Sequence, residues 1–332
     1  MMLDFKRWFS FTRPTQSASA VKPAMMIEPY SEQRKAGAVL LGLASDLSQH
    51  YFDAHAGTKE GPDSIRRALA ALPTTTALPL YDAGVIDEQQ VAVFPETGFE
   101  AMRAYQYQKL RDMLQLGHLP VMLGGGHEVA IGSYLALSDT VYHAANDMQS
   151  DGPAQIPHAC QPKVGIINID ANFQLRRTLA VRNGSAFHSV ASFCQETRRE
   201  FRYLGLGICD HTNSQSAFAY AKELGAEWLL DSQMKMKNRK QILATVNRYI
   251  DSVDHIHLSL DLAVFSSAIA EGVNMSRIYG VNLSVVEMVL KHIMASGKVR
   301  IFDVAGLNTE FDYQNHTAKL AAKLIQHALK NV

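Results

Sequence analysis

Three polar side chains follow an apolar run near the middle of the sequence. The run VGIINI (164–169) is followed by Asp170, and then by Asn172 and Gln174 two and four residues further on. In open α/β proteins, ligands bind beyond the carboxyl ends of the strands. Carboxylates bind divalent cations and exchange protons, whereas amides do not titrate and are weaker ligands. The stretch therefore indicates a metal or acid–base site in which part of the usual charge is missing.

Other polar residues follow or end apolar runs elsewhere in the chain. His127 comes after three glycines, Asp261 ends the run HLSLD, and Asp303 and Gly306 belong to the last run, DVAGLN. Because the carboxyl ends of parallel strands meet at one edge of a sheet, we expect these residues to lie together there. His188, in NGSAFHSV, is a further candidate ligand near the same edge.

The elements that must position these residues are short apolar runs that alternate with helical patterns. Strands are predicted at 36–46, 78–86, 119–126, 163–170, 202–209, 226–232, 255–262 and 299–307. Helices are predicted at 61–72, 97–117, from about 128, and at 214–225, 238–253, 283–297 and about 311–330. Such alternation is typical of βαβ units. It predicts an α/β protein with three α/β/α layers around a mainly parallel, eight-stranded sheet.

No linker or change in composition divides the periodic part of the chain. We expect a single domain over residues 36–332, preceded by an N-terminal arm over residues 1–35. The aromatic residues at the start of this arm are expected to pack on the same domain or on a neighbouring subunit; a helix that touches a membrane surface is the alternative. The polar segment 139–162 is predicted to be a surface insertion before the fourth strand.

Composition excludes several classes of partner. The 332 residues include 32 basic and 32 acidic side chains, so the formal net charge of zero gives no reason to expect nucleic acid or an anionic membrane. No apolar stretch approaches the roughly 18 residues that a bilayer crossing needs. The three cysteines show no C-x-x-C spacing, and the N-terminus lacks the apolar region of a signal peptide. These features predict a cytoplasmic protein.

Four long stretches together resemble the ureohydrolase superfamily of arginases and agmatinases, and within it the formimidoylglutamases. GGGHEVAIGSYLAL is similar to the family's Gly-Gly-His motif, and IINIDANFQLR to a strand that ends in Asp-Ala-His-Phe-Asp-Leu-Arg. HLSLDLAVFSSAIAEGV resembles Ser-x-Asp-x-Asp-x-Phe with Ala-Pro-Gly-Val, and DVAGLNTEFD resembles the family's Ala-Glu-Leu-Asn-Pro region. The likeness runs in order over roughly residues 36–330. It implies an arginase-like fold and assembly into a homo-oligomer.

The resemblance also implies a chemistry. Family members hold two Mn²⁺ ions with two histidines and four aspartates, and hydrolyse a guanidinium or amidine group. In formimidoylglutamases the products are glutamate and formamide. His127 matches the first histidine ligand, and Asp170 and Asp261 match the two aspartates that both ions share.

Four positions depart from the family pattern. Asn172 stands where the second histidine is expected, and Gln174 and Ala263 stand where aspartates are expected. Gly306 replaces a glutamate that contacts the cationic end of the substrate, so Gly306→Glu would be one step in restoring such a site. Asn172 and Gln174 can alternatively hydrogen-bond to the remaining carboxylates and relieve their repulsion.

These departures define the functional hypotheses. One metal position keeps His127, Asp170 and Asp261, with the Gln174 carbonyl as a candidate fourth ligand, so we expect at most one divalent ion or none. The leading hypothesis is a pseudoenzyme that acts as a binding or regulatory protein for a small amino-acid-like ligand. The alternatives are an active formimidoylglutamase-type hydrolase with one or an unusual metal, and a noncatalytic subunit that assembles with an active relative.

Overall fold

The described part of the chain forms one continuous parallel sheet. The computed structural model describes residues 24–32, 34–46, 57–73, 78–87, 91, 98–147, 161–275 and 277–332. Within these ranges, the strand order is β1-β3-β2-β4-β9-β8-β5-β6-β7, and each neighbouring pair is parallel. The strands are β1 (Glu28–Pro29), β2 (Ala38–Leu43), β3 (Leu80–Ile86), β4 (Leu119–Gly124), β5 (Val164–Ile169), β6 (Arg202–Ile208), β7 (Glu227–Leu230), β8 (His255–Asp261) and β9 (Val299–Ala305).

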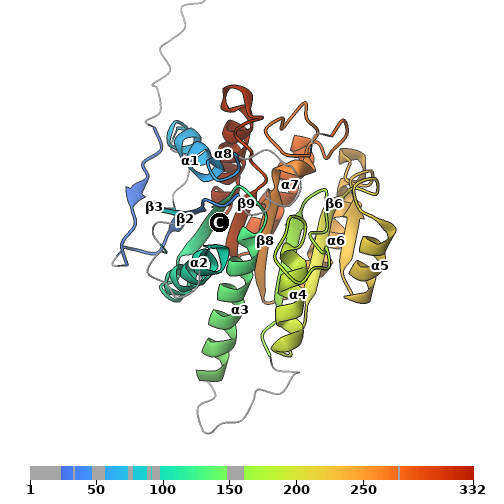
Figure 1. Cartoon of the computed structure of the whole chain (residues 1–332), viewed down its shortest axis with the longest axis horizontal. Coiled ribbons are helices and arrows are strands. Elements are labelled where there is room, and N and C mark those ends of the chain that lie inside the picture. Colours follow the sequence, from blue (N-terminus) through green and yellow to red (C-terminus); the bar gives the residue numbers. More distant parts are fainter. Residues whose placement is uncertain are drawn as a thin grey trace, which may run out of the picture.

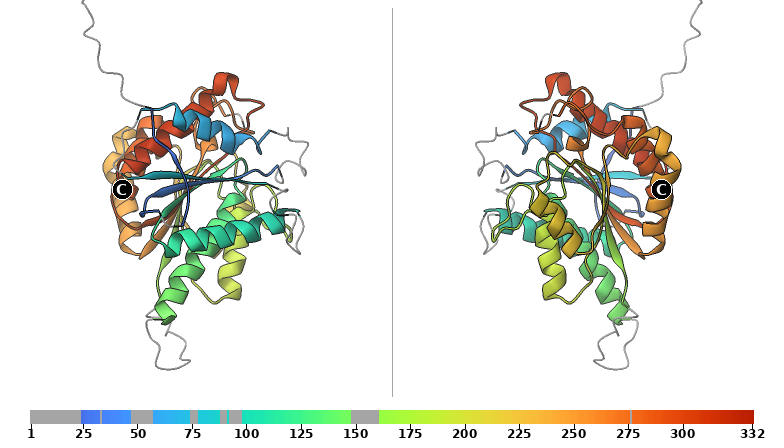
Figure 2. Two further views of the ribbon diagram at one scale, coloured as in Figure 1. Left: turned by 90° about the vertical axis from the view of Figure 1, so that its left-hand side faces the viewer. Right: turned by 90° about the vertical axis from the view of Figure 1, so that its right-hand side faces the viewer.

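Helices cover both faces of the sheet (Figures 1 and 2). The helices of one face are α1 (Gly61–Ala70), α6 (Arg239–Asp251), α7 (Leu283–Met294) and α8 (His316–Leu329). Those of the other face are α2 (Gly98–Gln115), α3 (Val129–Asp147), α4 (Ala186–Glu196) and α5 (Gln215–Glu223). Each helical layer encloses its own hydrophobic cluster against the sheet. The predicted three-layer α/β architecture is therefore confirmed.

The strands are apolar along their length because helices cover both faces of the sheet. Every residue of β2 (AVLLGL) and of β5 (VGIINI) is buried. A parallel sheet between two helical layers needs apolar side chains on both sides, so its strands lack the polar–apolar alternation of a half-exposed sheet. The eight predicted strands all occur, with ends that differ from the predicted ones by a few residues.

The sheet has a ninth strand that the sequence did not reveal. β1 is two residues long and contains a proline, so it carries no periodic pattern, yet it pairs with β3 through Glu28 and Pro29. Nearby, Met25 is 6% exposed and its N–H donates to Leu72 O. Part of the predicted arm, from residue 24 onward, is thus attached to the domain, while its aromatic start lies outside the described residues.

Two other predictions are corrected. Residues 186–196 form α4, which was not predicted because phenylalanine, valine, serine and cysteine favour helices weakly. Its burial pattern (Ala186, Phe187, Val190, Ala191, Cys194) is nevertheless helical. The segment 139–162 is not wholly an insertion, since α3 continues to Asp147; residues 148–160 lie outside the described part. No helix among the described residues combines the length and the apolar character that a bilayer crossing requires.

The attachment of β1 can be tested by truncation. A chain that begins at residue 36 should be less stable than one that begins at residue 24, because it loses the buried Met25 and the β1–β3 pairing. The loss of the Met25 side chain alone, in a full-length Met25→Ala variant, should lower the free energy of unfolding by about 2–5 kcal/mol. Urea denaturation measures both effects. Equal stability of the two truncated chains would show that the arm contributes nothing from residue 24 onward.

Candidate metal centre

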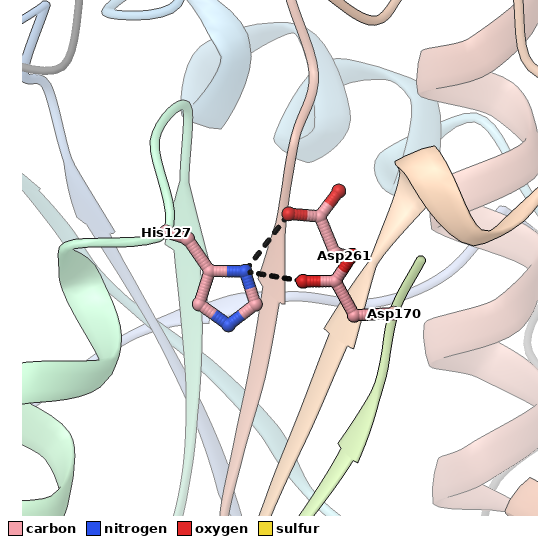
Figure 3. A group of neighbouring side chains, drawn as sticks. All are labelled: His127, Asp170 and Asp261. Atoms are coloured by element: carbon pink, nitrogen blue, oxygen red, sulfur yellow. Dashed lines mark hydrogen bonds and ion pairs between the residues drawn. The ribbon is translucent and has the colours of Figure 1, made fainter. Parts of the chain in front are cut away.

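Four neighbouring strands in the middle of the sheet bring the site residues together. The sheet order β4-β9-β8-β5 places the ends of these strands side by side although they are far apart in sequence. His127 follows β4 after two glycines, Asp261 is the last residue of β8, and Asp170 directly follows β5. In Figure 3 the three side chains point toward one another.

His127 lies between the two carboxylates. Its Nδ1 is 2.8 Å from Asp261 Oδ2 and 3.4 Å from Asp170 Oδ2. The candidate ligand atoms of the three residues lie within 4.8 Å of one another, and all three residues are buried. Only this group of histidine, cysteine and acidic side chains, among the described residues, is close enough to hold a metal ion.

The backbone holds the outer oxygen of each carboxylate. Asn172 N–H donates to Asp170 Oδ1 at 2.9 Å, and Ala263 N–H donates to Asp261 Oδ1 at 2.8 Å. The two N–H groups come from residues at matching positions, two past each aspartate. Each carboxylate therefore keeps its other oxygen, Oδ2, on the side of His127.

Ser259 is a member of the site to which the sequence had given no role. Its hydroxyl lies 3.0 Å from His127 Nε2, on the side of the ring away from the carboxylates. Since alternate residues of a strand share a face, Ser259 and Asp261 both project toward His127 from β8. A histidine that binds a metal through Nδ1 carries its proton on Nε2, and Ser259 Oγ is placed to accept it.

Asp303 belongs to a deeper network, so its predicted place at the edge of the sheet is wrong. It lies inside β9, where its Oδ2 is 2.5 Å from His257 Nε2 and its Oδ1 accepts from Ser133 Oγ at 2.9 Å. All three residues are completely buried. Asp303 is thus not available as a ligand, but its charge contributes to the field at His127.

The buried charges perturb the acidity of the group. Burial, together with the charge of Asp261, raises the pKa of Asp170 from 3.8 to about 7. Burial by itself opposes a charge on His127. The hydrogen bond and charge of Asp261, together with the charges of Asp170 and Asp303, outweigh it, so the pKa of His127 is raised. Without a metal, the group therefore retains protons near neutral pH, because positive charge is needed between the two carboxylates.

Gln174 has an unused acceptor beside these carboxylates. Its backbone has a φ of 56°, in the left-handed region, and its carbonyl accepts from the first N–H groups of α4, at Phe187 and His188. Its Nε2 donates to Asp170 Oδ2 at 2.8 Å, while Oε1 is buried without a partner. Rotation of the side-chain amide would turn this oxygen toward the centre.

The residues present fit one divalent cation. His127, Asp170, Asp261 and Gln174 offer one imidazole nitrogen, two carboxylates and one amide oxygen. Such a mainly oxygen set suits Mn²⁺ or Mg²⁺. Two carboxylates balance the charge of one divalent ion, and they leave a second ion uncompensated.

The residues at the second metal position fit poorly. The Asn172 side chain has its Nδ2 3.9 Å from Met275 Sδ, and Ala263 offers no side-chain donor. The only polar hydrogen of Ala263 is already used by Asp261. This is the part of the family's site that the sequence indicated to be missing.

The backbone at Gly306 leaves no room for the side chain of a glutamate. Its φ is +94°, and a Cβ atom at this position would lie 2.2 Å from Asp261 Oδ1. Because this oxygen is held by Ala263 N–H, it has little freedom to move. The idea that Gly306→Glu would complete a restored site is therefore wrong for this backbone.

His188 has another role. It lies on α4, where its Nδ1 is 2.9 Å from the hydroxyl of Tyr220, and it does not belong to the group around His127. Burial lowers its pKa, as does the charge of Arg177. Its position after β5 suggested a ligand, but α4 carries the side chain to a different neighbour.

The comparison with known proteins agrees with this geometry. The chain matches the model of the arginase family over residues 36–330. It is 32% identical over 325 residues to a formimidoylglutamase of Chromobacterium violaceum, covering 97% of both chains. It is 35% identical over 298 residues to a formimidoylglutamase of Aromatoleum aromaticum, covering 89% of this chain and 83% of that one.

Solved structures share the fold. The formimidoylglutamase of Bacillus subtilis superposes with a TM-score of 0.77 at 22% identity, covering 97% of this chain and 96% of that one. The formiminoglutamase of Trypanosoma cruzi, crystallised with Mn²⁺, gives a TM-score of 0.74 at 19% identity, covering 90% and 95%. The model match and the near-full-length identities above 30% establish that the chain belongs to the arginase family.

Proposed function

We propose that this chain is a formimidoylglutamase-type hydrolase that holds a single divalent cation, with Mn²⁺ as the first ion to test. The ligands would be His127, Asp170, Asp261 and Gln174. The observation that carries the proposal is the buried Gln174 Oε1, which has no partner and lies beside two carboxylates that face one imidazole. The relatives described as formimidoylglutamases support the reaction class, since they align with nearly the whole chain.

The proposed reaction breaks the bond between the formimidoyl carbon and the glutamate nitrogen. The oxygen of water ends on that carbon, one proton of water passes to the imine nitrogen, and this part leaves as formamide. The other proton passes to the second nitrogen, which leaves as the amine of glutamate. A bound divalent ion would supply a water molecule of lowered pKa and would polarise the amidine. Ser259 Oγ would hold the proton of His127 Nε2.

The departures from the family pattern had favoured a pseudoenzyme. The near-full-length likeness to formimidoylglutamases and the preserved group of donors support the hydrolase better. A noncatalytic binding protein, or a noncatalytic subunit beside an active relative, is the second candidate. It is favoured by Ala263 and Gly306, which offer no side-chain group to a second ion or to the substrate's cationic end. In the hydrolase proposal, the small amino-acid-like ligand is the substrate itself. Assembly into a homo-oligomer and a cytoplasmic location remain predictions.

The number of bound ions tests the proposal first. After loading with excess Mn²⁺ and desalting, elemental analysis should find one ion per chain, and the protein should hydrolyse N-formimidoyl-glutamate. Asp261→Asn, which keeps the size of the side chain but removes one ligand charge, should abolish both. Bound metal without hydrolysis would support the binding protein instead. Absence of both metal and turnover would overturn the proposal.

The stability of the metal-free protein should depend on pH through Asp170. Its pKa is about 7 in the folded chain and 3.8 in the unfolded chain, so the folded state binds more protons between these values. The free energy of unfolding should therefore fall as the pH rises from about 4 to 7 and stay low above, and the raised pKa of His127 acts in the same direction. In Asp170→Asn this contribution is absent. The thermal stabilities of the two proteins should diverge as the pH rises across this range. Mn²⁺ should remove the loss of stability in the wild type. Parallel stability curves would contradict the raised pKa of Asp170.

Restoring the family's ligands should change the metal requirement. The triple variant Asn172→His, Gln174→Asp, Ala263→Asp should be less stable than the wild type without metal, because it adds buried like charges. It should bind two Mn²⁺ ions and gain about 2.7 kcal/mol for each ion when free Mn²⁺ is 100 times the dissociation constant of that site. The matched control carries Asn172→Gln, Gln174→Asn and Ala263→Asn, which alter size without adding charge. If Mn²⁺ stabilises the control as much as the triple variant, the missing charges do not explain the metal content.

A further inference from the structure

A buried ion pair lies outside the group of candidate ligands. The Arg277 side chain is 7% exposed, and its Nη2 lies 2.9 Å from Asp231 Oδ2, in a side chain that is 16% exposed. Asp231 directly follows the edge strand β7, and Arg277 lies in the loop between the 3₁₀ turn η4 (Leu262–Val264) and α7. The pair thus joins the edge of the sheet to the segment that follows Asp261.

The second contact of Arg277 leads to the site. Its Nη1 donates to the carbonyl of Ala263 at 3.3 Å. The N–H of the same residue, Ala263, donates to Asp261 Oδ1 at 2.8 Å. A continuous series of polar contacts therefore runs from Asp231 through Arg277 and Ala263 to Asp261.

The loop that carries Arg277 is itself held against η4. Arg277 N–H donates to Ser267 Oγ at 2.8 Å, and Arg277 O accepts from Ser267 N–H at 2.7 Å. Val281 N–H donates to Val264 O at 2.9 Å. Gly280 packs so closely that a Cβ atom would lie 2.4 Å from the carbonyl carbon of Phe265. These contacts hold the backbone of Arg277, and Asp231 holds its guanidinium.

The burial of an ion pair is weak evidence for a stabilising role. Removing an arginine and a carboxylate from water costs several kcal/mol per ion, and an apolar pair of similar volume is often as stable or more stable. The planar guanidinium can donate in two fixed directions at once, which an ammonium group cannot reproduce. Here the two directions are Asp231 and the residue whose N–H holds Asp261.

We propose that Arg277, held by Asp231, is a positioning residue of the metal centre. It fixes Ala263, whose N–H keeps Asp261 Oδ1 turned outward and leaves Oδ2 facing His127. The expected effect on metal binding rests on the proposed function. The expected effect on the Asp261–His127 hydrogen bond does not, because it follows from the contacts of the metal-free chain alone.

The test compares two buried ion pairs. Arg277→Lys keeps the charge beside Asp231 but loses the second, fixed donor to Ala263. Arg199→Lys is the matched control, because the Arg199–Asp139 pair is similarly buried (14% and 19% exposed) and joins the residues after α4 to α3. Titration calorimetry should show that Arg277→Lys weakens Mn²⁺ binding by about 10-fold or more, a loss typical of residues that support metal ligands. Arg199→Lys should bind Mn²⁺ like the wild type even if both variants lose thermal stability.

A second measurement needs no metal. The proton on His127 Nδ1, hydrogen-bonded to a buried carboxylate, should give a downfield NMR signal that is absent in His127→Gln. This signal should shift or disappear in Arg277→Lys and stay unchanged in Arg199→Lys. Asp231→Asn, which keeps an acceptor for the guanidinium, should act in the same direction and serves if the lysine variant fails to fold.

The outcomes separate the two proposals. If the wild type binds no Mn²⁺, the proposed function fails, while the NMR comparison still decides the role of Arg277. If Arg277→Lys and Asp231→Asn leave both the signal and the Mn²⁺ affinity at wild-type values, Arg277 is not a positioning residue. Equal effects of Arg277→Lys and Arg199→Lys would likewise overturn the inference, because they would reflect a general loss of stability.

Discussion

The approach of two buried carboxylates to one imidazole is the constraint on which the centre depends. Asp170 and Asp261 both face His127 Nδ1, and water cannot offset their charges at such depth. Positive charge must therefore come from protons or from a cation. In the metal-free chain, the raised pKa values of Asp170 and His127 mean that bound protons supply this charge. A bound divalent ion would supply it instead.

Much of the surrounding structure keeps these carboxylates in place. Backbone N–H groups hold their outer oxygens, Ser259 holds the far side of the imidazole, and the buried Asp303–His257 pair lies beneath in the neighbouring strands. Gly306 leaves the space that Asp261 occupies. An added side chain would collide with a carboxylate that the backbone cannot release. The absence of a glutamate at this position is therefore built into the local backbone and is more than a change of one side chain.

The altered residues are neutral replacements that fit the remaining charges. Gln174 donates to Asp170 without adding a charge, and Ala263 uses only its backbone. Restricting the site to two carboxylates matches the charge of one divalent ion, whereas the family's larger set matches two. The lower charge does not affect the fold, which is kept by strands and helices away from the site.

The sequence by itself predicted the layers, the central strands and the candidate group His127, Asp170 and Asp261, whose members the structure brings together. Continuous apolar runs and helical periodicity are local, and the family motifs lie within single stretches. It could not reveal β1, which is too short to have a pattern, or α4, whose residues favour helices weakly. The positions of Ser259, Asp303 and Arg277 were likewise decided only by tertiary structure. Their roles depend on which strands are neighbours and on which way each side chain is turned. Strands β4 and β9, for example, are neighbours although they are far apart in sequence, with Val121 beside Phe302. Nor could a sequence show that Gly306 lacks room for a side chain, because that depends on where Asp261 Oδ1 lies in space.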